Sequence, residues 1–217
     1  MSDQSVTALD ASWHQRRWSW IALWLVAATL LYNVGEAVIA LVAGAEAHSV
    51  ALVGFGLDSV IETAAAIVIL WRLAIEARGA DPQTLERAER RVHVFVGVTF
   101  LLLAIYVTGQ AGWTLWNEQA PNASTIGIVL AAASLTIMPL VSWGKLRAAR
   151  EIGSAALRAE AKETLACSYL SFALLLGLVT NAAVGWWWAD PIAALLMVPW
   201  LVKEGFEGLS GQACCDD

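Results

Sequence analysis

Charge is scarce in this chain. Of its 217 residues, 15% are charged and 59% are hydrophobic, whereas soluble domains carry about 25% charged residues. Cysteine is scarce as well, because three residues, two of them adjacent near the C-terminus, cannot build a disulfide framework. The first 17 residues lack the apolar core and cleavage site of a signal peptide. These shortages exclude an ordinary soluble domain and a disulfide-bonded secreted domain, and the first apolar segment is expected to remain in the mature protein.

Long apolar stretches take up most of the chain. A helix needs about 20 apolar residues to cross a bilayer, and six stretches approach or exceed that length: 18–43, 49–75, 92–115, 123–143, 156–184 and 188–205. We expect an all-α integral membrane protein with six transmembrane helices. Its parts would be an N-terminal segment over 1–17, a six-helix transmembrane domain over 18–209 and a short Cys-containing tail over 210–217. Residues 76–91 are expected to form a solvated helical lead-in to the third span.

The basic residues predict the orientation. All 13 Lys and Arg residues lie before the first span, in or beside the second and fourth connections, or near the C-terminus. The positive-inside rule then places both termini in the cytoplasm, and we expect a multi-pass protein of the cell inner (plasma) membrane. The expected surroundings are the lipid bilayer, with no nucleic-acid partner, and the net charge of −6 is not informative about partners.

Two acids lie in the middle of the second span. Asp58 and Glu62 are four residues apart, so a helix places them on one face, one turn apart. A carboxylate at this depth is unfavourable unless a partner, a proton or a metal ion neutralises it. The fifth span repeats the spacing with Glu163 and Cys167. Two helices that each offer two anionic ligands suggest one four-ligand metal site between them.

The depths of these residues permit such a site. Glu62 and Cys167 lie at similar distances from the outer ends of their spans, whereas Glu163 lies farther away and would need a tilt or a helix break to join them. Carboxylate and thiolate ligands in a tetrahedral set suit zinc or a similar borderline-soft divalent ion. The alternative is a protonated carboxyl pair, with a buried thiol that packs as a small hydrophobe and no metal.

Three stretches resemble a known family. VALVGFGLDSVIET, LRAEAKETLACSYL and GWWWADPIAALL are similar to spans two, five and six of the cation diffusion facilitator (cation efflux) transporters. The resemblance implies a six-helix bundle of that kind, in which the transported ion sits between spans two and five. By position it makes Asp58, Glu62, Glu163 and Cys167 the metal ligands. It also implies a homodimer, held here through the transmembrane helices.

The departures from the family pattern concern the ion. Glu62 stands where the family has Asp, Glu163 where it has His or Asp, and Cys167 where it has Asp. A thiolate favours zinc, cadmium, ferrous iron or mercury over manganese and magnesium, so we expect a divalent metal ion as substrate, Zn²⁺ first, with Cd²⁺, Fe²⁺ or Hg²⁺ as alternatives. No organic cofactor is expected. The family's C-terminal cytoplasmic domain is not found in this sequence, since about a dozen residues follow the sixth span.

Other polar residues within the spans are weaker candidates. Glu36, with Asn33 one turn before it, is either an accessory ligand or proton relay, or a protonated contact between helices. Glu160 either attracts cations at the inner mouth or is a solvated end position. Asn181 and Asp190 are expected to join helices and to cap them.

The tail offers another thiol pair. Cys214 and Cys215 would capture a soft metal if they lie in the reducing cytoplasm, and a disordered tail is the alternative.

The ligand chemistry predicts a mechanism. Four acidic ligands in a low-dielectric site cannot all be ionised without a cation, and metal ligands bind deprotonated. Cation binding would therefore release protons, and a bundle that exposes the site to alternate sides would exchange metal for protons. We expect a metal/proton antiporter and no enzyme. The alternatives are a metal-binding or sensing membrane protein that does not transport, and a thiol-redox membrane enzyme that uses Cys167.

Overall fold

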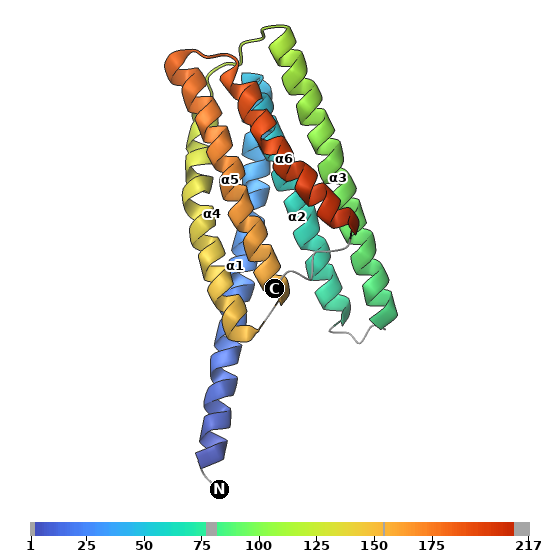
Figure 1. Cartoon of the computed structure of the whole chain (residues 1–217). Helices are drawn as coiled ribbons and strands as arrows, with labels where there is room; N and C mark the ends of the chain where they lie inside the picture. The colour runs from blue at the N-terminus through green and yellow to red at the C-terminus, as the bar shows by residue number, and fades with distance from the viewer. Residues whose placement is uncertain (1–2, 77–81, 154, 211–217) are drawn as a thin grey trace.

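A bundle of long helices forms the molecule. The computed structural model describes residues 3–76, 82–153 and 155–210, and over these residues the chain forms six helices (Figure 1). They are α1 (Asp3–Ala47), α2 (Val50–Glu76), α3 (Pro82–Trp116), α4 (Thr125–Ile152), α5 (Ala155–Val184) and α6 (Ala189–Ser210). The helices run side by side, and α1 extends beyond the others at the end where the chain begins.

The lengths of the helices agree with a membrane protein. Among the described residues, four stretches are long and apolar enough to cross a bilayer: Arg17–Ala47, Val94–Trp116, Thr125–Ile152 and Glu160–Val184. The protein is an all-helical membrane bundle, as predicted. Two helices begin earlier than the spans drawn from hydropathy. α1 runs without interruption from Asp3, and α3 begins at Pro82, which confirms the helical lead-in to the third span.

Close contacts between backbones bring particular helices together. α4 packs against α5, α3 against α6, and α1 against both α2 and α4. α3 and α6 approach so closely that a Cβ at Gly97 would lie 2.7 Å from the carbonyl oxygen of Gly205. A larger residue at Gly97 would push the two helices apart, so this glycine is required by the packing.

Two buried polar side chains join the ends of helices. The Asp190 carboxylate, in the first turn of α6, accepts hydrogen bonds from the backbone N–H groups of Val50 (2.8 Å) and Ala51 (3.3 Å) and from the Ser49 hydroxyl. The predicted capping role is therefore confirmed, although the helix that Asp190 caps is α2. Asn181 of α5 was expected to join two helices, but it donates instead to the carbonyl oxygen of Pro121, in the connection between α3 and α4, at 3.0 Å.

Candidate metal centre

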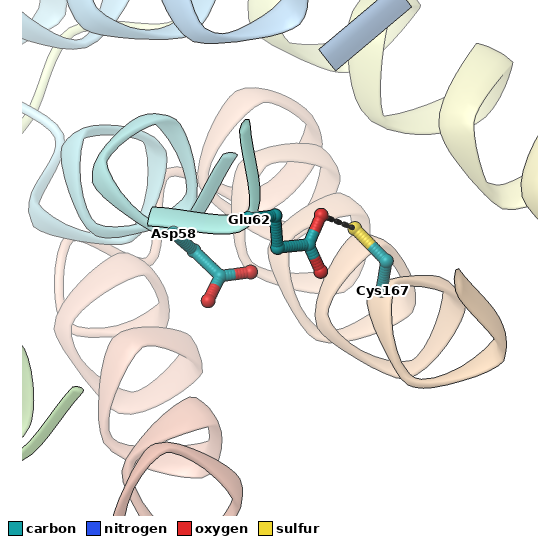
Figure 2. Close-up of side chains that lie close together, drawn as sticks. All are labelled: Asp58, Glu62 and Cys167. Atoms are coloured by element: carbon teal, nitrogen blue, oxygen red, sulfur yellow. Dashed lines mark hydrogen bonds between the residues drawn. The ribbon is translucent and has the colours of Figure 1, made fainter. Parts of the chain in front are cut away.

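The α2 helix presents two carboxylates on one face. Asp58 and Glu62 are one turn apart, and Figure 2 shows both side chains on the side of α2 that faces Cys167. Asp58 is 1% exposed, and neither of its carboxylate oxygens has a hydrogen-bond partner. Buried polar groups are nearly always paired, and an unpaired buried charge is strongly unfavourable. A buried carboxylate without a hydrogen-bond partner indicates that it binds a cation or a proton.

Cys167 completes a group of three. Its side chain, 1% exposed, projects from α5, and its Sγ lies 3.7 Å from Glu62 Oε2, to which it donates (Figure 2). One ligand atom from each of Asp58, Glu62 and Cys167 lies within 4.8 Å of the other two. Elsewhere in the described part of the chain no other group of three His, Cys, Asp or Glu residues meets this test. The geometry suits one metal ion held between α2 and α5.

Glu163 stands apart from this group. It lies one turn before Cys167 on α5, but it is not within 4.8 Å of the other three ligand atoms, and its side chain is exposed. Its charge and that of Glu204 on α6 still interact with Asp58. The structure thus brings three of the four expected ligands together and leaves Glu163 at the edge of the site, as its different depth suggested.

The α1 helix contributes a layer of polar groups behind the carboxylates. The amide nitrogen of Asn33 donates to Glu62 Oε2 at 3.0 Å. Glu36, 1% exposed, accepts hydrogen bonds from Ser59 on α2 at 3.0 Å and from Ser134 on α4. Tyr32 shares a hydrogen bond of 2.9 Å with Ser134. Asn33 therefore touches the group of three, whereas Glu36 is already paired with hydroxyl groups.

A match to known proteins agrees with this arrangement. The family model of the cation efflux transmembrane domain covers residues 26–210, a range that includes all six helices in whole or in part and every residue of the site. The chain belongs to the cation efflux family.

Three known proteins are similar to this chain in sequence. An uncharacterized transporter of Synechocystis sp. is 29% identical over 150 residues, which are 68% of this chain and 48% of that protein. The manganese efflux system protein MneS of Bacillus subtilis is 25% identical over 172 residues, 78% of this chain and 59% of MneS. The cation-efflux pump FieF of Shewanella oneidensis is 27% identical over 112 residues, 52% of this chain and 36% of FieF. The chain therefore spans less than two thirds of the length of each relative.

Glu160, which was expected either to attract cations or to be solvated, has a basic partner. Lys145 of α4 is fully buried, and its Nζ lies 3.0 Å from Glu160 Oε1 and 3.0 Å from the hydroxyl of Thr164. The side chain of Glu160 is 21% exposed. Glu160 is thus engaged in an ion pair that joins α4 to α5, and it is neither a free acid nor a freely solvated one.

Sequence reasoning did not single out Lys145, Glu204 or the serines around Glu36. For Lys145 a signal was present, because it continues the stripe of residues by which α4 faces its neighbours. That stripe consists of Gly127, Ala131, Ser134, Met138, Ser142, Lys145 and Ala149. Glu204 has no such signal, because an acid near the end of an apolar span looks like a solvated residue. The tail residues Cys214 and Cys215 lie outside the described residues, so metal capture there stays a prediction.

Proposed function

We propose that this protein transports a divalent metal cation out of the cell through a site that Asp58 and Glu62 of α2 and Cys167 of α5 form. The observation that supports it most is the bare carboxylate of Asp58, which is buried without a hydrogen-bond partner beside a second carboxylate and a thiol. Membership of the cation efflux family agrees with this function. The three residues come from two helices, so a relative movement of α2 and α5 would change the distances between the ligands and therefore the affinity for the ion.

Zn²⁺ is the first choice for the ion, and Cd²⁺, Fe²⁺ and Hg²⁺ follow. Two carboxylates and a thiolate form a mixed set of hard and soft ligands, which suits borderline ions better than Mg²⁺. The relative MneS is named for manganese, and the carboxylates of this site would accept that ion as well. The thiol of Cys167 is the feature that favours softer ions here.

Protons are the proposed counter-ion. An empty site with one buried carboxylate, one partly buried carboxylate and a buried thiol would not hold three negative charges, so it would bind protons instead. A metal ion needs these ligands deprotonated, and its binding would release protons. Cation affinity should therefore fall as the pH falls, and a proton gradient directed inward would drive the metal out. Glu163 and Glu204, whose charges interact with each other and with Asp58, would attract the cation toward the site.

The surroundings proposed for the protein follow from the basic residues. Their distribution supports the proposal that both termini lie in the cytoplasm and that the protein lies in the inner (plasma) membrane. A homodimer formed by the transmembrane helices is the proposed assembly.

Transport into proteoliposomes tests the function. Purified protein reconstituted into vesicles that contain a fluorescent zinc indicator should take up Zn²⁺ faster when the vesicle interior is acidic than when the two sides have equal pH. Asp58→Asn should remove this uptake, because it removes a ligand charge that nothing else supplies. Uptake that ignores the pH gradient would overturn proton antiport. Metal binding by the purified protein without any transport would favour a sensing or storage protein. A wild-type protein that binds no metal would overturn the site itself.

A further inference from the structure

Asn33, which the sequence suggested as an accessory residue of the site together with Glu36, brings one more oxygen atom to it. Asn33 of α1 is 6% exposed, and its amide nitrogen donates to Glu62 Oε2 at 3.0 Å. The same Glu62 oxygen accepts a hydrogen bond from the Cys167 thiol. Asn33 is therefore in direct contact with the group of three, from a third helix.

The oxygen of that amide has no partner. Asn33 Oδ1 is buried without a hydrogen bond, as are the two oxygens of Asp58. A buried acceptor without a partner is unfavourable. Since the oxygen and nitrogen of an amide branch from one carbon, an amide whose nitrogen contacts Glu62 keeps its oxygen beside the same carboxylate. A half-turn of the amide exchanges the two atoms and would turn the oxygen toward an ion held by Glu62.

The site lacks a fourth ligand in this arrangement. Zinc-like ions take four ligands in a tetrahedral set, and Asp58, Glu62 and Cys167 supply three, while Glu163 stands outside. We propose that the side-chain oxygen of Asn33 is the fourth ligand of the transported cation once its amide has made this half-turn. This inference rests on the proposed function, because it concerns how the same site chooses its ion.

An amide oxygen is a hard and uncharged ligand, and this decides the selectivity. Side-chain carbonyl oxygens suit Mn²⁺, Mg²⁺ and Ca²⁺, whereas a thiolate suits Cd²⁺ and Zn²⁺. Asn33 would therefore contribute more to the binding of Mn²⁺ than to that of Cd²⁺, and Cys167 would do the reverse. Asn33 of α1 and Cys167 of α5 would together determine the relative affinity of the site for hard and soft ions.

Calorimetric titration of the purified protein with MnCl₂ and with CdCl₂ tests this assignment. Asn33→Leu should weaken Mn²⁺ binding by about tenfold or more, and Cd²⁺ binding by less than about threefold, because the thiolate holds the softer ion. Asn33→Asp keeps an oxygen and should restore Mn²⁺ binding to at least the wild-type level. Asn181→Leu is the matched control, since it removes a buried asparagine whose amide bonds Pro121 away from the site. The ratio of the two affinities should not change in this control.

Each other result has a definite meaning. If Asn33→Leu weakens both ions by the same factor and Asn33→Asp does not restore Mn²⁺ binding, Asn33 only holds Glu62 in place, and the ligand assignment is overturned. The assignment also fails if Glu163→Gln, rather than Asn33→Leu, selectively weakens Mn²⁺. In both cases the proposed function stands, because the wild type still binds metal. A wild type that binds neither ion, with Asp58→Asn indistinguishable from it, overturns the proposed function as well.

Discussion

The ammonium group of Lys145 lies 3.0 Å from Glu160 Oε1 and has no exposed surface. Its second partner is the hydroxyl of Thr164, also at 3.0 Å. Both partners belong to α5 while Lys145 belongs to α4, so the contact joins the two helices. A buried base of this kind is unfavourable unless its charge is neutralised, and here the ammonium group donates hydrogen bonds to one carboxylate and one hydroxyl.

Removing this lysine should destabilise the bundle strongly. Breaking a buried ion pair from one side costs about 3–5 kcal/mol, and because the Glu160 side chain is 21% exposed, Lys145→Ala should cost about 3 kcal/mol, the lower end of this range. The free energy of unfolding, measured in mixed detergent with increasing denaturing detergent, should fall by about that amount. Lys203→Ala is the control, because Lys203 forms an exposed pair with Glu207 at 3.4 Å that should contribute about 0.5 kcal/mol. If the free energy of unfolding fell equally in the two variants, the buried Lys145 pair would contribute no more to stability than an exposed pair.

Asp58→Asn should remove the stabilisation of the folded protein by bound metal. The substitution keeps the size of a buried side chain but removes a charge that has no partner in the bundle, so the protein without metal should melt at the same temperature as the wild type or above it. Cd²⁺ at about 100 times its dissociation constant should stabilise the wild type by about 2.7 kcal/mol and the variant not at all. Thermal melting with and without Cd²⁺ measures both effects. A variant that Cd²⁺ still stabilises would remove Asp58 from the site.

Cys167→Ser should change which ion the site prefers. A hydroxyl is a hard and poor ligand compared with a thiolate, so Cd²⁺ affinity should fall by about tenfold or more while Mn²⁺ affinity changes little. The ultraviolet charge-transfer band of a cadmium–thiolate bond should appear when Cd²⁺ binds the wild type and be absent in the variant. Transport of Mn²⁺ that persists in the variant agrees with a transporter. Loss of every measurable activity would instead indicate that Cys167 reacts as a thiol.

Asp190→Ala should disturb the site from a distance. It removes the acceptor for the backbone N–H groups of Val50 and Ala51, and losing a helix cap costs about 0.5–2 kcal/mol. Cation affinity, measured by titration, should fall as well, because α2 carries two of the ligands. Ser124→Ala is the control, since Ser124 caps α4 through Gly127. It should lower stability to a similar extent and leave cation affinity unchanged.

The helices and most of the site are readable from the sequence, for physical reasons. Runs of about 20 apolar residues mark helices in a membrane because the backbone must satisfy its own hydrogen bonds there. A carboxylate within such a run is energetically unfavourable, so Asp58 and Glu62 indicate a functional site, such as one for a metal ion or a proton. The spacing of four residues also places the members of each pair on one helical face. The family resemblance then connects α2 with α5.

Contacts between helices that are distant in the sequence are not readable in this way. The depth of Glu163 in its span raised the question of whether it reaches the other ligands, but only the tilt of α5 against α2 decides it. Lys145 continues the buried stripe of α4, but that it pairs with Glu160 follows only from how α4 packs against α5. The role of the Asn33 amide likewise depends on how α1 lies against Glu62.

The Asp190 contact has a consequence for how the protein is made. The start of α2 is held by a residue that follows it by more than a hundred positions, and ribosomes deliver the N-terminal part of a chain first. During synthesis α2 therefore enters the membrane before the carboxylate that fixes its starting point exists. Until the last helix inserts, the backbone N–H groups of Val50 and Ala51 lack this acceptor, and only Ser49 caps the start of α2, through Leu52. We therefore expect a chain truncated before α6 to bind metal more weakly than the whole chain, although all of its proposed ligands have been made.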